Sequence, residues 1–543
     1  MHFHSSATVE RPAEMAVQVP GLIGIVVSYL VVLAVGLWSG RRKGGRSVSK
    51  DDPFLANRQL GLVISIFTMT ATEIGASFIT GIAEEMARNG VLWLYGPVCY
   101  SMGICIAACV YLRKMRNAGY YTIFDPIQTK YGAKMGGLLF IPEFIGELFW
   151  EASILVSLGA TLSVILDLNS TITIIISACV AVVYTFFGGL YSVAYTDVVQ
   201  LILVFIGLIL GLSFALTNPA VDFSRINDTW IGHVPTDRGF IYADDVLMLI
   251  GGGIPWQSYY QRALACKTNS IAICASVLSV IITIFAIVPP ALFGAIGAAT
   301  EWNSTDYGGE IPIPDSYWVM AVPMVLQHLC PTAVAVIGIG AVSAAGMSST
   351  DSIILSTGTV FARNIYKNII RPKATEREVI WILRFSILMV GVVGAVVAIT
   401  VNSVIGLYIL SGDLMYVILF PQLTCALWVH CANTYGSLVG FIVSLTMRLL
   451  AGEPLLDFPA TIRYPYYHES LGQLFPHKTF VMIIHYVCII AISFTTDTLF
   501  KKSYLPLKYD VLRCFGPIKD KQRGESCADA DASDESFELE TAL

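Results

Sequence analysis

Two long apolar segments of this chain are interrupted near the middle, at matching places in two halves of the sequence. The first interruption lies at residues 71–75 (ATEIG) and the second at residues 251–256 (GGGIPW). A pair of interrupted hydrophobic segments in corresponding halves indicates a transporter site near the midplane of the bilayer. Unwound backbone frees carbonyl oxygens that can hold Na⁺, and the ends of half-helices supply partial charges. The sequence therefore predicts an ion-coupled carrier.

The composition is typical of a membrane protein. Of the 543 residues, 55% are hydrophobic and only 13% are charged, whereas soluble domains carry about 25% charged residues. The net charge of −6 argues against nucleic acid as a partner, while apolar spans need membrane lipid around them. The 12 cysteines lack the paired spacing of a disulfide framework or a zinc site.

The spans predict the topology. A spanning helix needs about 20 apolar residues, and about thirteen such segments lie between residues 21 and 500, the first at about 21–38. With the N-terminus outside, every segment predicted inside is basic, as the positive-inside rule requires; one of them holds Arg262 and Lys267. We therefore expect an extracellular segment 1–20, a transmembrane domain 21–500 and a cytoplasmic tail 501–543 that is predicted to be disordered.

The spans around the two interruptions form two sets of five. The first set covers about 59–217 and the second about 244–429. Because five is odd, the second set crosses the membrane in the opposite direction to the first. This arrangement is an inverted repeat in which each set opens with a broken helix. The predicted fold class is an all-α membrane protein with a five-plus-five inverted repeat and about thirteen transmembrane helices.

Two short motifs predict modification or partners. Asn303-Ser304-Thr305 is a glycosylation sequon in a loop that the topology places outside. The C-terminal residues Thr541-Ala542-Leu543 could serve as a ligand for a PDZ-type domain, although such an ending also arises often by chance. Nothing in the sequence indicates an oligomeric state.

Charged residues within the spans are mostly acids, and charges in such positions are costly and usually functional. An interior rich in carboxylates favours a cation as cargo. Three of the acids recur every four residues, so a helix places them in one stripe that should face water or protein; an alternative for the first is a place near a helix end in the interface. The acids are Glu73, Glu84, Glu85, Glu143, Glu147, Glu151, Asp197, Asp351 and Asp413, and the stripe is Glu143, Glu147 and Glu151.

Residues 345–352 (AGMSSTDS) are dense in oxygen. Na⁺ prefers several oxygens from carbonyl, hydroxyl or carboxylate groups. Ser348 and Ser349 could supply hydroxyls, and the first interruption could supply the carbonyls of Ala71 and Ile74. The alternative is that these serines bond to their own helix or let helices pack closely. Asp351 favours the site, because a carboxylate in a span needs a cationic partner.

Aromatic residues lie near both interruptions. Trp93, Tyr100, Trp150 and Trp256 are the candidates, since aromatic faces hold a quaternary ammonium at about 0.5–2 kcal/mol each. Interfacial belts are the alternative for tryptophans, and we favour that alternative for Trp93. Trp150 could line the site or face lipid. Trp256 directly follows the second interruption, which is hard to reconcile with a belt.

Several long motifs add a family resemblance. Residues 188–200 (GGLYSVAYTDVVQ) resemble the signature of the sodium:solute symporter family. Further matching stretches lie at 67–72, 135–142, 253–257, 343–349, 361–366 and 420–423. The resemblance covers about 21–515, and within the family the chain is most similar to members that transport choline.

The resemblance implies specific site residues and a specific fold. It implies a LeuT-type inverted-repeat core with thirteen spans, a plasma-membrane location with the N-terminus outside, a possible place in synaptic vesicles, and Cl⁻ dependence. It implies glycosylation at Asn303. It also implies Na⁺ ligands, an acid linked to a further Na⁺, and a choline cage. The Na⁺ ligands are Ala71, Ile74, Ala345, Ser348 and Ser349. The acid is Asp351, and the cage is formed by Tyr100, Trp150 and Trp256.

Glu73 departs from the family pattern. Choline transporters place a tryptophan there as a wall of the cage, so this chain exchanges a cation–π contact for charge attraction. Glu73 is therefore a further candidate for substrate binding; the alternatives are that it is protonated or that it pairs with Na⁺. The predicted function is Na⁺-dependent import of choline by alternating access. The alternatives are transport of another organic cation, or a non-transporting sensor or leak channel. We expect no enzyme, because no nucleophile–base arrangement or His cluster is evident.

Overall fold

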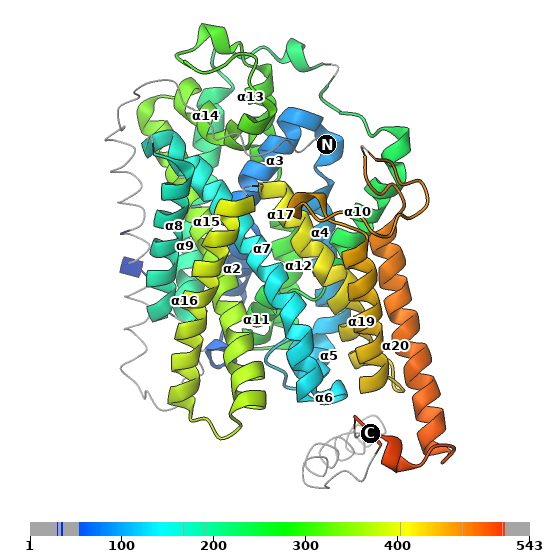
Figure 1. The fold of residues 1–543 in the computed structure, drawn as a ribbon. Helices are drawn as coiled ribbons and strands as arrows, with labels where there is room; N and C mark the ends of the chain where they lie inside the picture. Colours follow the sequence, from blue (N-terminus) through cyan, green and yellow to red (C-terminus); the bar gives the residue numbers. More distant parts are fainter. Residues whose placement is uncertain are drawn as a thin grey trace, which may run out of the picture.

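The computed structural model describes Leu30, Ala34, Val35 and residues 54–515, except 167, 189, 228, 402, 470 and 513. The expectations for segment 1–20 and for Thr541–Leu543 therefore lie outside the described residues, as does the first span at about 21–38 apart from Leu30, Ala34 and Val35. Within them the chain is helical, and β pairing is limited to four isolated bridges. The helices stand side by side in one bundle, with α13 and α14 at its upper end (Figure 1).

The helices before and at the second interruption are bounded as follows: α2 (Leu62–Glu73), α3 (Ala76–Asn89), α4 (Tyr95–Ile106), α5 (Leu112–Asn117), α6 (Phe124–Tyr131), α7 (Ala133–Leu166), α8 (Ser170–Gly188), α9 (Leu190–Ala215), α10 (Gly239–Gly252) and α11 (Gln257–Ala265). Those that follow are α12 (Asn269–Phe285), α13 (Val288–Ala299), α14 (Ala321–Leu329), α15 (Thr332–Val360), α16 (Glu376–Val401), α17 (Val404–Leu414), α18 (Phe420–Trp428), α19 (Thr434–Leu450) and α20 (His477–Lys501).

Many of these helices can cross a membrane. Among the described residues, seven helical stretches are long and apolar enough, or up to eight when the bent pair α2 and α3 is one span. Further apolar helices, such as 170–183 and 434–450, are shorter than that limit. The expected count of thirteen spans stays a prediction, as do the exact bounds of the two repeats.

The first interruption separates α2 from α3, whose axes differ by 51°. Ile74 leaves the helical conformation with ψ 74°, and Gly75 is extended at φ −90°, ψ 178°. The break confirms the interruption expected at residues 71–75. It leaves the last carbonyls of α2 without the helical N–H partners that a continuous helix would supply.

The second interruption separates α10 from α11. A turn at Gly253–Pro255 follows α10, and Trp256 is extended at φ −89°, ψ 114° before α11 begins. Proline has no N–H to donate and disfavours helical backbone at the residue before it, so the Ile254-Pro255 pair ends the first half-helix. The interruption expected at residues 251–256 is therefore confirmed.

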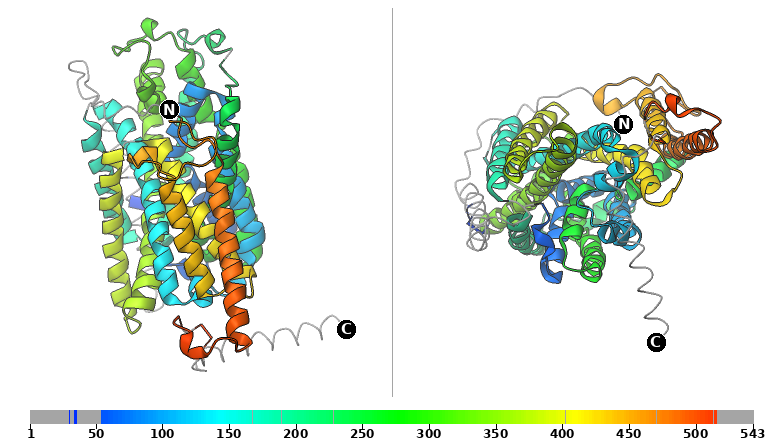
Figure 2. Two further views of the ribbon diagram at one scale, coloured as in Figure 1. Left: turned by 45° about the vertical axis from the view of Figure 1, so that its right-hand side comes forward. Right: turned by 90° about the horizontal axis from the view of Figure 1, so that it is seen from below.

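Helix α15 is the central helix of the bundle. Every residue from Gly338 to Val360 is buried, and the helix packs on α9, α7 and α16. The apolar stretch 318–361 is not one helix: α14 ends at Leu329, and α15 starts at Thr332 after the Cys330-Pro331 pair. By contrast, α19 and α20 pack mainly on each other at one side of the bundle (Figure 2).

Glycines let three helices around the second interruption approach backbone to backbone. A Cβ added to Gly103 of α4 would lie 2.3 Å from the carbonyl oxygen of Ile250 in α10. A Cβ added to Gly252 of α10 would lie 2.5 Å from the carbonyl oxygen of Gly412 in α17. Any larger residue at these two positions would push the helices apart.

Candidate functional site

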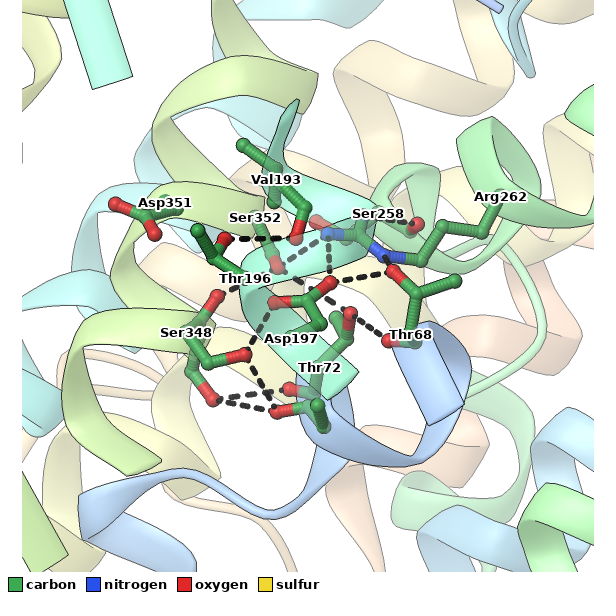
Figure 3. A network of polar contacts seen from close by, with 12 residues as sticks. Thr68, Thr72, Val193, Thr196, Asp197, Ser258, Arg262, Ser348, Asp351 and Ser352 are labelled. Atoms are coloured by element: carbon green, nitrogen blue, oxygen red, sulfur yellow. Dashed lines mark hydrogen bonds and ion pairs between the residues drawn. The ribbon is translucent and has the colours of Figure 1, made fainter. Parts of the chain in front are cut away.

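Serine hydroxyls of α15 meet the broken end of α2 (Figure 3). The Ser348 Oγ donates to the carbonyl oxygen of Ala71 at 3.3 Å. The Ser349 Oγ donates to the carbonyl oxygens of Ala71 at 3.5 Å and Thr72 at 3.1 Å. Both serines are buried. The two helices thus bring hydroxyl and carbonyl oxygens together where the sequence predicts a Na⁺ site.

Gly75 allows this approach. A Cβ added there would lie 2.6 Å from the Ser349 Oγ, well inside van der Waals distance. Glycine at this position therefore lets α15 come close enough for its hydroxyls to reach the α2 carbonyls.

The remaining predicted Na⁺ ligands lie on the same two helices. Ile74 is the C-cap of α2, and its N–H donates to the carbonyl oxygen of Thr70 at 3.0 Å. Ala345 is buried on α15, one turn before Ser349. The positions suit carbonyl ligands, and the ligand roles of Ala71, Ile74, Ala345, Ser348 and Ser349 stay predictions.

Asp197 of α9 is the centre of the polar network, although we did not predict it as a site residue. One carboxylate oxygen accepts from the Ser348 Oγ at 2.6 Å, and the other accepts a short hydrogen bond from the Thr68 Oγ1. The Arg262 guanidinium lies 3.6 Å from the same carboxylate. The sequence signal was present, because Asp197 is an acid inside a span and inside the 188–200 motif.

Arg262 corrects one feature of the predicted topology. We expected it in a basic segment facing the cytoplasm, but its side chain is fully buried in α11. It donates to the Thr68 Oγ1 at 3.1 Å, to the Ser258 carbonyl oxygen at 3.2 Å, and to the Ser352 Oγ. A buried guanidinium needs such partners, so Arg262 is part of the core and not a loop charge.

Asp351 lies to one side of this network (Figure 3). One carboxylate oxygen accepts from the Thr185 Oγ1 of α8 at 2.6 Å, and the other has no hydrogen-bond partner among the described residues. The side chain is fully buried. The structure thus places Asp351 toward α8, while Ser348, on the same helix, faces α2 and α9.

The three aromatic residues expected to hold an organic cation form one cluster. The ring centroids of Trp150 and Trp256 are 4.6 Å apart, those of Tyr100 and Trp256 are 5.8 Å apart, and those of Tyr100 and Trp150 are 6.3 Å apart. The rings come from α7, the second break and α4, and all are buried. Trp150 therefore lines the interior and does not face lipid.

Glu73 is the last residue of α2 and is 8% exposed. Its Oε2 accepts a hydrogen bond from the Thr283 Oγ1 of α12 at 2.9 Å. Its Oε1 has no hydrogen-bond partner among the described residues. A buried carboxylate oxygen in this state attracts a donor or a cation.

Asn303 lies on the surface in the connection between α13 and α14. It is exposed, and its Nδ2 donates to the Glu301 Oε1 at 3.2 Å. The position is accessible for glycosylation, which stays a prediction.

The chain matches one family over most of its length. The model of the "Sodium:solute symporter family" matches residues 54–444. The chain is 45% identical to a "High-affinity choline transporter 1" of Drosophila melanogaster over 512 residues, 93% of this chain and 83% of the relative. It is 42% identical to a "High affinity choline transporter 1" of Homo sapiens over 513 residues, covering 92% and 88% of the two chains.

Solved structures match the fold. A Na⁺-coupled sialic acid symporter in a substrate-bound outward-open state gives a TM-score of 0.71 at 15% identity, covering 89% of this chain and 98% of that one. The inward-facing conformation of Mhp1 gives a TM-score of 0.52 at 14% identity, covering 83% and 94%. The expected all-helical, LeuT-type fold class is thereby confirmed.

These relatives are transporters, which agrees with the prediction that the chain is no enzyme and disfavours the sensor and leak-channel alternatives. The broken helices, the oxygen-rich contact of α2 with α15 and the aromatic cluster are the parts that such a transporter needs. The chain is therefore a member of the sodium:solute symporter family, a multi-pass membrane protein whose transport is coupled to sodium.

Proposed function

We propose that this protein is a Na⁺-dependent symporter that imports choline across the plasma membrane by alternating access. The observation that carries the proposal is the cluster of Tyr100, Trp150 and Trp256 at the second broken helix. Aromatic faces are the usual protein partners of a quaternary ammonium. The names of the relatives at 42–45% identity support the same substrate.

A bound Na⁺ ion would be coordinated by both α2 and α15 and would link them. Carbonyl oxygens of Ala71, Ile74 and Ala345 with the hydroxyls of Ser348 and Ser349 offer the hard oxygen ligands that it prefers. Binding there stabilises the arrangement in which the two helices are in contact. An ion that binds one conformation better shifts the equilibrium toward it by its difference in affinity. Asp351, buried nearby on α15, is proposed to help hold a further Na⁺.

Glu73 is proposed to take part in substrate binding beside the aromatic cluster. Its unpartnered Oε1 supplies charge attraction for a cation at the end of α2. Choline then meets aromatic faces on one side and a carboxylate on another. The preference among organic cations follows from that balance, because a carboxylate also attracts primary and secondary amines.

The membrane potential supplies part of the driving force. Two net charges moving inward across 100 mV gain about 4.6 kcal/mol, at about 2.3 kcal/mol per charge. That free energy supports a concentration ratio above about 10³. Efficient capture of a scarce cation is therefore compatible with this fold.

Several finer assignments belong to the same proposal. The N-terminus lies outside and the C-terminal tail inside, so the loop with Asn303 is exposed to the glycosylation machinery. Repeats at about 59–217 and 244–429 are the units that move against each other. The proposal also includes Cl⁻ dependence, a synaptic-vesicle location and a PDZ-type partner that binds Thr541–Leu543.

The test is uptake by cells that express the chain. Radiolabelled choline is supplied in Na⁺ buffer and in buffer with Na⁺ replaced by an impermeant cation, for the native chain and for Glu73→Trp. We expect Na⁺-dependent choline uptake in the native chain, with unlabelled choline competing better than betaine or polyamines. Uptake of another cation in place of choline would overturn the substrate. Electrical current without any uptake would overturn transport itself.

A further inference from the structure

Helix α7 carries three buried carboxylates that the proposed function does not use. Glu143, Glu147 and Glu151 are each 0% exposed. All six of their carboxylate oxygens lack a hydrogen-bond partner among the described residues, and none of the ion pairs there includes them. An ionised carboxylate buried without partners costs several kcal/mol. These three side chains therefore need an occupant that neutralises them.

Two contacts fix the register of α7 against α15. A Cβ added to Gly346 of α15 would lie 2.4 Å from Leu158 of α7. Further along, the rings of Phe140 and Phe361 have centroids 6.0 Å apart. The two helices are therefore antiparallel neighbours over this whole stretch.

The register brings Glu147 to a height similar to that of a threonine of α15. Glu147 precedes Leu158 by eleven residues, and Thr357 follows Gly346 by eleven. Eleven residues turn a helix by about 1,100°, which is three full turns and about 20°. Glu147 therefore lies on nearly the same face of α7 as Leu158, and Thr357 on nearly the same face of α15 as Gly346. By this register, Glu147 and Thr357 lie on the two facing surfaces, within about one helical turn of each other in height.

Thr357 and Thr350 supply independent evidence for a ligand. Thr350 lies four residues after Gly346, within about 40° of the same face. Both threonines are 0% exposed, and the hydroxyl of each lacks a hydrogen-bond partner among the described residues. Buried hydroxyls are rarely left unpaired. The α15 side of this contact therefore offers polar groups toward the acid stripe.

The other two acids extend the stripe along α7. A Cβ added to Gly394 of α16 would lie 2.8 Å from the Glu151 carboxyl carbon, so this glycine makes room for the acid. Glu143 lies seven residues before Trp150 and within about 20° of its face. Successive acids are separated by about 6 Å along the helix. The stripe therefore runs from the level of the aromatic cluster toward the N-terminal end of α7.

The described residues give no support for a metal chelated by several side chains as the occupant. No group of three or more His, Cys, Asp or Glu side chains in the described part of the chain could hold a metal ion. Single protons have no such requirement, because each carboxyl binds its own. Chains of acids of this kind serve as proton relays in pumps and transporters.

The charged groups of the surrounding helices leave the stripe without a cationic partner. The nearby acids bind partners of their own: Asp351 of α15 bonds to Thr185, and Asp413 of α17 pairs with Arg448 of α19.

On α3, Glu84 pairs with Arg88, and Glu85 bonds to Asn89. On α16, Arg384 lies over the rings of Phe186 and Trp381, and in the π-helix Phe361–Ile370 after α15, Arg363 lies over Tyr121. On α6, Asp125 bonds to Thr122 and Asn364, and Lys130 to the His430 carbonyl oxygen. On α2 and α4, Glu73 bonds to Thr283, and Tyr100 is within electrostatic reach of Glu147.

We propose that Glu143, Glu147 and Glu151, with the hydroxyls of Thr350 and Thr357, form a proton-binding column between α7 and α15. Its three acids lie on α7, whereas the oxygen-rich site lies between α2 and α15. Protons that it takes up and releases make the rate of transport depend on pH. Each carboxyl is neutral when it carries a proton and then donates a hydrogen bond to a neighbouring oxygen.

The direct test is infrared spectroscopy of the purified full-length protein. We expect a carbonyl stretch of protonated carboxyl groups that weakens as pH rises, and that loses intensity in Glu147→Gln. The matched control is Glu310→Gln, at an exposed loop position, which should leave the band unchanged. A band that responds to Na⁺ and not to pH would overturn the proton as occupant. A band that is absent, or insensitive to all three glutamine variants, would overturn the column.

A second test measures uptake against external pH, and this readout alone rests on the proposed function. A rate that depends on one proton changes by up to about tenfold per pH unit. We expect that dependence in the native chain and a flatter profile when all three acids are glutamine. If the triple variant does not reach the membrane, Glu143→Gln and Glu151→Gln are measured singly. A native profile in the variants would overturn the proposal. Failure of native uptake at every pH would count against the substrate, while the infrared result would still decide the column.

Discussion

The Arg262 guanidinium lies 3.6 Å from the Asp197 carboxylate, and both side chains are fully buried. Thr68 joins them: it donates to Asp197 and accepts from Arg262. Arg262 belongs to α11, Asp197 to α9 and Thr68 to α2, so the ion pair connects α11 to α9, and Thr68 connects both to the helix before the first break. Ser348, which also donates to Asp197, extends the connection to the predicted Na⁺ site.

Neutralising one member of this pair should destabilise the protein. Asp197→Asn leaves the Arg262 charge buried without its counter-ion, which costs about 3–5 kcal/mol. We expect a lower melting temperature of the purified protein and less protein at the cell surface. The double variant Asp197→Asn, Arg262→Gln removes both charges and should recover most of the loss. An Asp197→Asn variant as stable as the native chain would contradict this account.

The Ser349 hydroxyl should contribute to Na⁺ affinity. Ser349→Ala removes an oxygen that faces the Ala71 and Thr72 carbonyls, and one lost polar contact is worth about 1 kcal/mol or more. We expect the Na⁺ concentration for half-maximal uptake to rise about five- to tenfold. The control is Ser386→Ala on α16, whose hydroxyl bonds to its own helix at Ile382. Equal effects of the two substitutions would argue against the Na⁺ role.

Gly75 should tolerate alanine poorly, for a steric reason. Its extended backbone suits any residue, but an added Cβ would lie 2.6 Å from the Ser349 Oγ. Gly75→Ala should therefore displace that hydroxyl and weaken Na⁺ activation of uptake. Gly61→Ala is the matched control: Gly61 is the extended N-cap of α2, and a Cβ there would meet nothing within 4 Å. If Na⁺ activation of uptake is the same in both variants, the proximity of Gly75 to Ser349 does not affect Na⁺ binding.

Trp256 should set the affinity for the organic cation. Trp256→Leu keeps an apolar side chain and removes an aromatic face worth about 1–2 kcal/mol. We expect the KM for choline to rise about five- to thirtyfold, with the Na⁺ dependence retained. Trp381→Leu, at a tryptophan that is 62% exposed on α16, is the control. An unchanged KM in the first variant would remove the aromatic cluster from the binding site.

The second helix break was predictable because its causes are local. The Ile254-Pro255 pair and the glycines at 251–253 disfavour a continuous helix whatever surrounds them. Ser348 and Ser349 were also predictable as site residues, because an oxygen-rich run within an apolar span can be recognised in a single sequence. Tyr100, Trp150 and Trp256 were already candidates because they lie near the interruptions, and the family resemblance grouped them into one cage.

The ion pair was not predictable by the same means. Asp197 and Arg262 are 65 residues apart, and only tertiary packing brings them together. Arg262 follows an apolar run, so counting positive charges along the chain assigned it to a loop. A short half-helix after a break can place a charge inside the bundle at the point where a continuous span would already have left the membrane.

The glycine contacts of α4, α10 and α17 affect how these helices can move. Where Gly103 meets Ile250 and Gly252 meets Gly412, backbone lies against backbone and no long side chains interlock. Two such surfaces can slide past each other without first repacking rotamers, which is the shear type of motion. Helix α10, which leads into Trp256, can therefore shift along α4 and α17 at low cost. Bulky substitutions at these glycines should hold the transporter in one conformation more readily than they unfold it.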